Sequence, residues 1–475
     1  MRKTKIICTL GPSTDDENVL RSMMNAGMNV ARFNFSHQTH EEHKTRVEMI
    51  KRLRDELNLP IAMLADTKGP EIRLGTFENG SETLIEGQKF TLTTREVSGT
   101  NEIASITFKG LPHDVRPTTR ILIDDGLIEL AVERVNGEDI QCVVINGGIV
   151  KDRKGINVPN AQVSLPFLSE QDCADLKFAV ENGFDFVAAS FSRCAEDIMQ
   201  MRGVLNSYGG QKIRIIAKIE NAQGVDNIDS ILNAADGIMV ARGDLGVEIP
   251  FEEIPVIQKK LIKKAYKANK QVITATQMLE SMINNPRPTR AETTDIANAI
   301  YDGTSAIMLS GETAAGKYPV TVVEYMARIA ERTERDIDYG KRFFNSRPVS
   351  PCSVSDAISH ATCAAAIDVA AAAIITVTMS GKTARMISSN RPYHPIFCCT
   401  PDKTVMRQLN LSWGVYPLYI PEAKTTDELL DMAVKAVMQT GALKDGDLAV
   451  VTSGAPLNSS NSTNMLRVYH IGETI

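Results

Sequence analysis

The chain opens with short apolar runs that alternate with longer stretches carrying charge. Short apolar runs that end in charge are typical of buried parallel strands whose carboxyl ends reach solvent. Strands are predicted at residues 6–10, 29–35 and 61–65, and helices at 15–26 and 40–57. Ser13 or Thr14 is expected to cap the first helix, and Thr39 the second. The N-terminal segment is therefore predicted to form βα units.

At Pro70 the pattern changes to a β type. Residues 70 to about 167 carry many Gly and Thr, and several runs alternate apolar with polar residues, as half-buried strands do. These runs lie at 83–85, 90–94, 103–108, 120–124, 127–135 and 140–145. Asn136-Gly137 marks a hairpin turn. The pattern predicts a small all-β domain inserted after the third strand.

The βα alternation resumes at Ser169. Strands are predicted at 184–190, 215–217, 238–241, 271–276 and 305–310. Helices are predicted at 170–181, 196–206, 253–268, 289–300 and 320–336, and a further one between the strands at 215–217 and 238–241. The total is eight strands, each followed by a helix. Eight such units predict a TIM (β/α)8 barrel.

Residues 345–351 have the composition of a linker. Beyond them, strands at 374–378, 396–399, 416–419, 448–452 and 465–470 alternate with helices at 355–372, 383–389, 403–409 and 426–440. This order predicts a doubly wound α/β sheet. Three domains are expected: a discontinuous barrel at 1–69 and 168–344, a β-rich lid at 70–167, and a C-terminal α/β domain at 345–475.

Composition narrows the functional class. The net charge of −6, without a basic block, argues against nucleic acid as the main partner. The eight cysteines are scattered, which fits reduced thiols in a cytoplasmic protein. The longest apolar run, 361–377, is alanine-rich and contains Asp368, so it is expected to be a core helix and strand and not a membrane span.

Polar residues follow the predicted barrel strands, where barrel enzymes place their chemistry. They form a ring of candidates: Arg32, Asn34, Ser36, Asp66, Thr67, Lys68, Lys218, Glu220, Arg242, Asp244, Thr276, Ser310 and Glu312. Carboxylates suit Mg²⁺ or Mn²⁺, and the cations suit a phosphorylated or carboxylated substrate. The alternative for any single residue is a strand-end salt bridge.

Four of these residues offer hard oxygen ligands with one formal negative charge: Asn34, Ser36, Asp66 and Thr67. This set suits a monovalent cation better than a divalent one. A network of hydrogen bonds among short polar side chains is an equal alternative.

Three histidines, His37, His40 and His43, lie nearby in the sequence. They cannot share one helix face and are expected to be solvated, with only His37 close to the mouth of the barrel.

The segment Thr378–Thr383 joins a predicted strand to a helix N-terminus. It ends in Gly381-Lys382-Thr383 but lacks the earlier glycine of a P-loop. Its hydroxyl groups and lysine still suit an anion, such as a sugar phosphate. The alternative is a simple helix cap.

With these residues in view, the chain resembles the pyruvate kinase family over essentially its whole length. The matching stretches are Thr9–Pro12, Ala31–His37, Asp66–Arg73, Lys154-Gly155, Ala217–Asn221, Met239–Gly246, Ala275–Ser281 and Met308–Thr313. The resemblance implies a TIM barrel with an inserted all-β lid and a C-terminal α/β effector domain, in agreement with the pattern. It also implies a homotetramer.

The resemblance implies transfer of a phosphoryl group from phosphoenolpyruvate to ADP, giving pyruvate and ATP, the last step of glycolysis. Glu220 and Asp244 would hold Mg²⁺ or Mn²⁺. Lys218 would neutralise charge on the phosphoryl group in flight, and Arg32 would bind the phosphate as a fork donor.

The other roles are implied in the same way. Backbone N–H groups near Gly243 and Asp244, with Thr276, would hold the substrate carboxylate, and Thr276 and Ser310 are candidates for a proton relay through water. The nucleotide would contact these residues: Asn34, His37, Arg73 and Lys154.

Two further sites follow from the resemblance. The four oxygen donors match the family's K⁺ ligands: Asn34, Ser36, Asp66 and Thr67. An acidic residue at position 71, here Glu71, accompanies K⁺ dependence in the family. The effector cradle is expected at Thr378, Ser380, Lys382 and Thr383, with fructose 1,6-bisphosphate as the leading ligand, although the facing loop 453–464 departs from the family pattern.

Two alternatives stay open at this point. A metal-dependent aldolase acting on pyruvate-like keto acids has a similar barrel, but it needs no nucleotide clamp such as Arg73 and Lys154. A non-catalytic effector-binding relative should have lost Lys218 or a metal carboxylate, and this chain keeps them.

Overall fold

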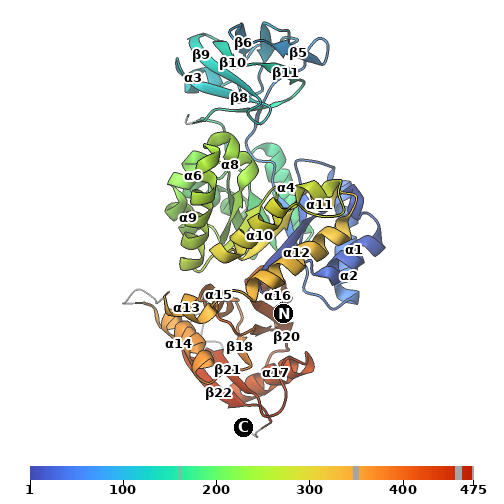
Figure 1. Ribbon diagram of the computed structural model, residues 1–475, viewed down its shortest axis with the longest axis vertical. Helices are drawn as coiled ribbons and strands as arrows, with labels where there is room; N and C mark the ends of the chain where they lie inside the picture. Colours follow the sequence, from blue (N-terminus) through green and yellow to red (C-terminus); the bar gives the residue numbers. More distant parts are fainter. Residues whose placement is uncertain (160, 162, 346–351, 455–462, 473–475) are drawn as a thin grey trace.

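The computed structural model describes residues 1–159, 161, 163–345, 352–454 and 463–472. Three parts follow one another along the long axis (Figure 1). The β-rich part lies at one end, the barrel in the middle, and the C-terminal α/β part at the other end. The predicted linker 345–351 lies almost entirely outside the described residues.

The middle part is a closed barrel of eight parallel strands. Around the barrel they are β1 (Lys5–Thr9), β17 (Ala306–Leu309), β16 (Gln271–Ala275), β15 (Gly237–Ala241), β14 (Arg214–Ile219), β13 (Phe186–Ala189), β3 (Ala62–Asp66) and β2 (Val30–Asn34). Each predicted strand is confirmed to within two residues. The interior is filled by fully buried apolar side chains such as Ile7, Phe186 and Ile273, so the barrel is a packed core and not a pore.

Helices surround the barrel and carry the connections between its strands (Figure 1). They are α1 (Glu17–Ala26), α2 (His40–Glu56), α4 (Glu170–Glu181), α5 (Ala195–Ser207), α6 (Ala222–Asp226), α7 (Ile228–Ala234), α8 (Arg242–Glu248), α9 (Ile254–Lys267), α10 (Arg290–Asp302), α11 (Gly311–Ala314) and α12 (Pro319–Glu334), the last of which follows the final barrel strand. The next helix, α13 (Tyr339–Phe344), lies with the C-terminal part (Figure 1). Thr39 caps α2 in a capping box with Glu42, as expected. The cap of α1 is Asp16, so the prediction of Ser13 or Thr14 was wrong because those residues form a short 3₁₀ turn instead.

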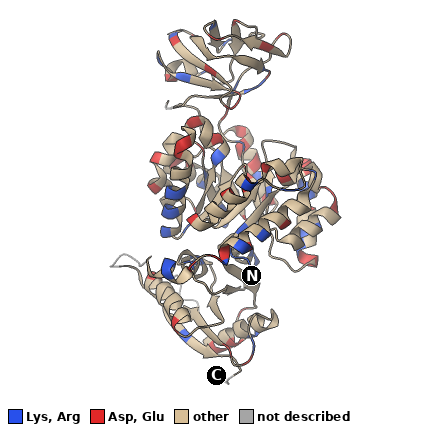
Figure 2. Ribbon diagram, in the orientation of Figure 1, with Lys and Arg blue, Asp and Glu red and all other residues tan. Residues whose placement is uncertain are grey.

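The charges of the outer helices follow their dipoles. Figure 2 shows acidic residues near the upper end of α9 and basic residues along its lower part. Glu252 and Glu253 precede this helix, and Lys264 and Lys267 lie in its last turn. This arrangement stabilises the helix.

The inserted part is built on an antiparallel sheet with one parallel pair. The strand order is β4 (Ile72–Arg73), β12 (Gly155–Asn157), β8 (Arg120–Ile123), β9 (Ile128–Asn136), β10 (Asp139–Asn146), β6 (Lys89–Thr93) and β7 (Ile103–Ser105), while β11 (Gly148–Lys151) pairs with β5 (Ser81–Leu84). A short helix, α3 (Leu111–Asp114), completes it. The predicted hairpin turn after Asn136 is confirmed, with Gly137 at a positive φ of 62°. The first and last strands, β4 and β12, pair with each other.

The C-terminal part is a five-stranded sheet covered by helices. Its order is β20 (Val415–Tyr419), β19 (Ile396–Thr400), β18 (Ala373–Val377), β21 (Leu448–Ser453) and β22 (Met465–His470), and only β22 is antiparallel. The helices are α14 (Val354–Asp368), α15 (Lys382–Ser389), α16 (Lys403–Leu409) and α17 (Thr426–Gln439). This sheet confirms the predicted fold class.

The C-terminal part packs against one end of the barrel, which we call its foot. Leu411 is fully buried and joins the apolar cluster of the barrel interior. Arg407 forms an ion pair with Asp185 (Nε–Oδ1 2.8 Å), and Lys5 donates to the carbonyl oxygen of Val415 at 2.6 Å. Burial of one leucine contributes about 1.5–3 kcal/mol, so these contacts hold the two parts together.

All eight cysteines lie in the described part of the chain and are unpaired, and five of them are buried. Within the described residues, no helix is both long enough and apolar enough to cross a membrane.

Candidate active site

The carboxyl ends of the barrel strands bring the predicted site residues together at one mouth, which faces the β-rich part (Figure 1). β2 and β3 pair with Asn34 opposite Asp66. Two strands away from β3, β14 carries Lys218 and leads directly to Glu220. Asp244 follows β15, the next strand, on the short helix α8. The ends of these parallel strands therefore form one polar surface.

A buried chain of alternating charges crosses this mouth. Arg32 Nε lies 2.7 Å from Asp66 Oδ2, and Lys218 Nζ lies 3.1 Å from Asp66 Oδ1 and 2.9 Å from Glu220 Oε1. Lys218 also donates to Ser190 Oγ at 2.8 Å. All four charged side chains are about a tenth exposed or less. Such a network is held in one geometry because each buried charge needs its partners.

The network controls the protonation of its members. Burial disfavours the charged form of Lys218, but Asp66 and Glu220 outweigh that effect and raise the pKa of the ammonium group. Burial also opposes ionisation of Asp66, yet Lys218 and Arg32 lower its pKa below the usual value. Burial raises the pKa of Glu220 to about 7, against the pull of Lys218, and Asp244 adds to the rise. Lys218 is therefore a permanent positive charge, while Glu220 is held as an ionised group only by nearby cations.

Glu220 and Asp244 fit a divalent cation. Glu220 Oε2 accepts a hydrogen bond from the backbone N–H of Phe191 at 2.6 Å, whereas Oε1 is buried and accepts no well-aligned hydrogen bond, although Lys218 Nζ lies 2.9 Å away. A buried carboxylate oxygen of this kind is suited to a metal ion. In the described part of the chain, no cluster of three or more His, Cys, Asp or Glu could hold one. The remaining ligands would come from water or substrate.

A strained loop after β16 forms the next section of the mouth. Thr276 and Gln277 both have positive φ, 70° and 54°, which non-glycine residues rarely adopt. Arg242 holds this loop: it donates to the carbonyl oxygen of Thr276 at 2.6 Å and pairs with Asp295 at 2.7 Å. Thr276 Oγ1 in turn accepts from the backbone N–H of Gly243 at 2.8 Å. Arg242 is thus a partner in a salt bridge, as the alternative in the sequence analysis had it, and its guanidinium group positions the loop.

Ser310 lies at the start of α11, and its backbone N–H donates to Glu312 Oε2 at 2.6 Å. Glu312 is completely buried and also accepts from the backbone N–H of Leu279 at 3.0 Å. Glu312 therefore connects the loops after β16 and β17, which places Thr276 and Ser310 on neighbouring sections of the mouth.

The four predicted K⁺ ligands lie together after β2 and β3. Asn34 Oδ1 accepts from the backbone N–H of Ser36 at 3.2 Å, and Thr67 Oγ1 donates to the carbonyl oxygen of Ala188 at 3.2 Å. The Asp66 carboxylate is occupied by the two cations described above. These contacts show that the alternative, a network of hydrogen bonds and ion pairs, exists in part at these four residues.

The expectation of solvated histidines was wrong for His43. Its side chain is 1% exposed, its ring centroid lies 4.7 Å from that of Phe35, and Nε2 lies 3.2 Å from the carbonyl oxygen of His37. Burial lowers the pKa of His43 to about 4. His40 lies 2.6 Å from Asp175, and only His37 is exposed near the mouth. His43 occupies an apolar site because Phe33 of β2 and Phe35, just beyond it, reach the first turns of α2.

Arg73 and Lys154, the two cations predicted to contact the nucleotide, are paired with carboxylates close to them. Arg73 Nη2 lies 2.8 Å from Glu71 Oε2, and Arg73 Nη1 donates to the carbonyl oxygen of Arg153 at 3.0 Å. Lys154 Nζ lies 2.7 Å from Asp124 Oδ1. Arg73 and Lys154 are about a third exposed. Both are therefore near solvent and held by carboxylates that an anionic ligand can displace.

The inserted part also contacts the barrel mouth through residues that the sequence analysis did not select. Asn157 Nδ2 donates to Glu248 Oε1 of α8 at 3.3 Å. Asp124 and Asp125 both have a φ of 54°. Burial raises the pKa of Asp125, with further contributions from Asp244 and Asp124, so this turn lies close to the barrel carboxylates. A positive φ at two successive aspartates gives no recognisable sequence pattern.

The predicted effector turn joins β18 to the start of α15. Gly381, with a φ of 74°, donates its N–H to Thr378 Oγ1 at 3.1 Å, and Ser380 Oγ lies 3.5 Å from the N–H of Lys382. Lys382 is exposed at the start of α15. Thr383 is buried, and its hydroxyl bonds to that of Thr463. Most of the facing loop 453–464 lies outside the described residues.

Comparisons with known proteins agree with this geometry. The family described as "Pyruvate kinase, barrel domain" matches residues 1–323, and "Pyruvate kinase, alpha/beta domain" matches residues 356–469. The chain is 50% identical to a pyruvate kinase of Geobacillus stearothermophilus, over all of this chain and 81% of that protein. It is 49% identical to a pyruvate kinase of Clostridium acetobutylicum, over 98% of this chain and 99% of the other.

A crystal structure of a pyruvate kinase from Cryptosporidium parvum superposes with a TM-score of 0.94. The two chains are 38% identical, and the match covers 99% of this chain and 96% of that one. Sequence and structure therefore agree from the first barrel strand to the last strand of the C-terminal sheet. The chain belongs to the pyruvate kinase family.

Proposed function

We propose that the barrel mouth transfers the phosphoryl group of phosphoenolpyruvate to ADP, giving pyruvate and ATP. The observation that carries the assignment of roles is the buried chain formed by Arg32, Asp66, Lys218 and Glu220. Phosphoryl transfer needs fixed positive charge where negative charge is spread over the moving group. Lys218 supplies that charge from a position fixed by two carboxylates, and Arg32 binds the phosphate with the guanidinium N–H groups that Asp66 and Thr9 leave free.

Glu220 and Asp244 would hold Mg²⁺ or Mn²⁺. The chemistry that the bound cation supplies is neutralisation of charge at the substrate oxygens. Glu220, together with Asp66, also keeps Lys218 charged, so this carboxylate serves both purposes. Asn34, Ser36, Asp66 and Thr67 would hold K⁺.

The loop after β16 and the start of α8 would bind the substrate carboxylate. Backbone N–H groups at Gly243 and Asp244 point from a helix N-terminus, where anions bind well. Gly243 already donates to Thr276 Oγ1, so the threonine hydroxyl and the substrate carboxylate would share this corner. Thr276 and Ser310 would guide a water molecule that protonates enolpyruvate, because neither hydroxyl is itself a strong acid.

Arg73 and Lys154 would clamp the nucleotide phosphates when the inserted part closes as a lid over the barrel mouth. Each would exchange a carboxylate partner, Glu71 or Asp124, for a phosphate oxygen. Asn34 and His37 would contact the nucleotide from the barrel side.

The decisive experiment is an assay of pyruvate formation coupled to its reduction. Pyruvate should form only when phosphoenolpyruvate, ADP and Mg²⁺ are all present, in buffer containing K⁺. Failure to form pyruvate, with or without K⁺ and sugar phosphates, would contradict the proposal. The C-terminal turn would bind a sugar-phosphate effector, and the protein would act as a homotetramer.

A further inference from the structure

A pocket of about 280 Å³ lies between the foot of the barrel and the C-terminal part. The barrel contributes Arg202, Lys212 and Arg214, and the C-terminal part contributes Ser380, Asp402 and Gln408. Ser380 belongs to the predicted effector turn, so this pocket lies on the side of the turn that faces the barrel. Thr383, the last residue of the turn, instead bonds to Thr463, which precedes β22.

The pocket carries an excess of positive charge. Arg202 and Arg214 share one carboxylate, that of Asp236, at 2.9 and 3.0 Å. Lys212 pairs with Asp402 at 2.8 Å. These three lining cations therefore meet two carboxylates.

Two further cations, Arg385 and Lys270, do not line the pocket but lie close enough to Arg214 to be repelled by it. Arg214 and Arg385 both donate to the carbonyl oxygen of Ser380, at 3.4 and 3.2 Å, and Lys270 donates to the carbonyl oxygen of Ala235 at 2.7 Å. In the described part of the chain neither Arg385 nor Lys270 forms an ion pair. Burial, and then repulsion from Arg214, lowers the pKa of Arg385 to about 9. Cations that outnumber the carboxylates around them, between two packed parts of a protein, are stabilised by a bound anion.

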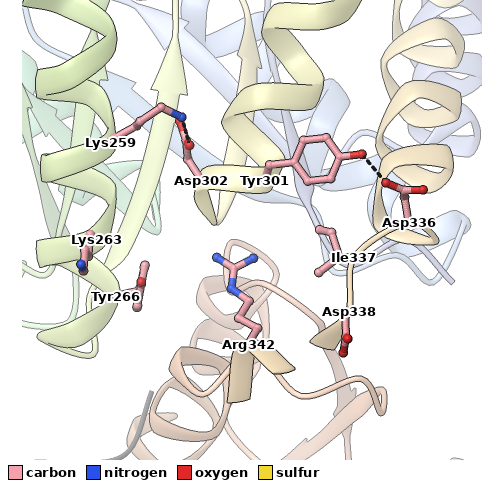
Figure 3. Close-up of a pocket in the computed structure, with 9 residues that line it drawn as sticks. All are labelled: Lys259, Lys263, Tyr266, Tyr301, Asp302, Asp336, Ile337, Asp338 and Arg342. Atoms are coloured by element: carbon pink, nitrogen blue, oxygen red, sulfur yellow. Dashed lines mark hydrogen bonds and ion pairs between the residues drawn. The ribbon is translucent and has the colours of Figure 1, made fainter. Parts of the chain in front are cut away.

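A second pocket shows that such an excess is not general. It has a volume of about 510 Å³ and lies between the lower ends of α9 and α10 and the start of α13 (Figure 3). Its three cations face three carboxylates, and they are Lys259, Lys263 and Arg342 against Asp302, Asp336 and Asp338. Lys259 is bonded to Asp302. That pocket is balanced by the protein itself and calls for no ionic ligand.

We propose that the pocket lined by Arg202, Lys212 and Arg214 binds a small phosphate-bearing anion. Guanidinium groups match phosphate oxygens with paired N–H donors. Thr404 and Ser380 add hydroxyl groups at the pocket wall. The site lies at the opposite end of the barrel from the proposed substrate mouth, and it does not depend on the effector role of Lys382.

Binding of the anion would affect the two barrel strands that lead to the proposed metal ligands. Arg214 is the first residue of β14, whose other end carries Lys218 and leads to Glu220. Asp236 immediately precedes β15, which leads to Asp244. An anion bound to Arg214 would replace the Ser380 carbonyl as its partner, and thus change how the C-terminal part is attached to these two strands.

The test is titration of the full-length protein with inorganic phosphate by calorimetry, at constant ionic strength with chloride as the replacement anion. Lys212→Met and Arg202→Met should each weaken binding at this site about tenfold, because each removes a charged donor. Phosphate bound at the barrel mouth contributes equally to all variants, so the difference reports this pocket. Arg134→Met, at an exposed lid position, is the control for loss of one positive charge and should bind like the wild type.

Asp402→Asn gives a result in the opposite direction. Asp402 caps α16 by accepting from the N–H groups of Thr404 and Val405, and asparagine can keep this cap. Removal of its charge should tighten phosphate binding several-fold, which a damaged fold cannot do. Equal affinity in wild type, Lys212→Met and Asp402→Asn would overturn the proposal. So would loss of this binding in Lys382→Ala alone, because that result would place the anion in the effector turn.

Discussion

Lys218 and Asp66 form an ion pair of 3.1 Å although they stand at the ends of barrel strands that are not neighbours. β13 lies between their strands, and the residue that follows it, Ser190, completes the arrangement. Ser190 Oγ accepts from Lys218 Nζ at 2.8 Å and lies 3.3 Å from Asp66 Oδ1. The ammonium group is thus positioned by three strand ends before any substrate arrives, which is the condition for electrostatic stabilisation without reorganisation.

Lys218→Met should lower the rate of phosphoryl transfer by at least about 10²–10³-fold, because the lost charge acts mainly where negative charge develops. Protonation of enolpyruvate should be less affected, and metal binding should be nearly unchanged. Single-turnover assays of the two half-reactions separate these effects. Lys435→Met, at an exposed position on α17, should behave like the wild type. Equal losses in both half-reactions would contradict the assigned role.

Activity should rise strongly with K⁺ and much less with Na⁺. Glu71 bonds to Arg73 and lies 3.7 Å from Lys68, so it neutralises positive charge near the hinge of the lid. Glu71→Lys should weaken the dependence on K⁺ by supplying a fixed positive charge. Glu71→Gln is the matched control, since it removes the negative charge without adding a positive one.

The measurement is a K⁺ titration at constant ionic strength, with a bulky organic cation as the replacement. A flat response in the wild-type protein would remove the proposed cation site, and with it the role given to Asn34, Ser36, Asp66 and Thr67.

Stability should fall in mild acid because of His43. Its pKa is lowered from 6.5 to about 4, so the unfolded chain takes up the proton first. The contribution of His43 is fully present above pH 6.5 and is lost as the pH falls towards 4, by at most about 3 kcal/mol. Chemical unfolding of the wild type and of His43→Gln at pH 7 and pH 4.5 tests this. The variant should lose less stability on acidification, whereas His113→Gln, on an exposed residue, should match the wild type.

Lys382→Ala should abolish activation by fructose 1,6-bisphosphate. Lys382 is the exposed cation at the start of α15, where a phosphate would gain both its charge and the helix N–H groups. The rate at saturating effector, divided by the rate without effector, is the quantity to compare with the wild type. Undiminished activation would move the effector site away from the turn Thr378–Thr383.

The protein should be a homotetramer at micromolar concentration. This expectation comes from the family and agrees with the preference of soluble enzymes for closed symmetric assemblies. Light scattering coupled to size exclusion gives the mass directly. A mass near that of one 52.0 kDa chain would refute the prediction.

The sequence predicted long, buried elements well because their patterns are local. The barrel strands are apolar runs bounded by charge, and Thr39 with Glu42 forms a recognisable cap. Short elements were missed because they contain too few residues to show a local pattern. β4 has two residues and β12 has three, too few to show a period of two. The helix α8, with the sequence RGDLGVE, contains two glycines and lacks a capping side chain, so it gives no helical signal.

Positions of site residues were predictable where strand ends fixed them, as for Arg32, Lys218 and Glu220. Their partners were not predictable when the partner lay far away in the sequence. Arg242 looked like a substrate cation because Asp295, on a separate helix, cannot be linked to it from sequence. His43 looked solvated since its burial depends on Phe33 and Phe35, at and just beyond the end of β2.

The pairing of β4 with β12 has a consequence for how such a protein could arise. Ile72 and Ile156 lie opposite each other, so the chain leaves and re-enters the barrel through one narrow two-stranded stalk. For the folding of the barrel, the entire insertion is therefore equivalent to a closed loop, and its length adds little to the entropic cost of loop closure. An inserted domain attached in this way can be exchanged, enlarged or removed while the barrel keeps its fold. The substrates of the protein can then change while the eight barrel strands stay the same.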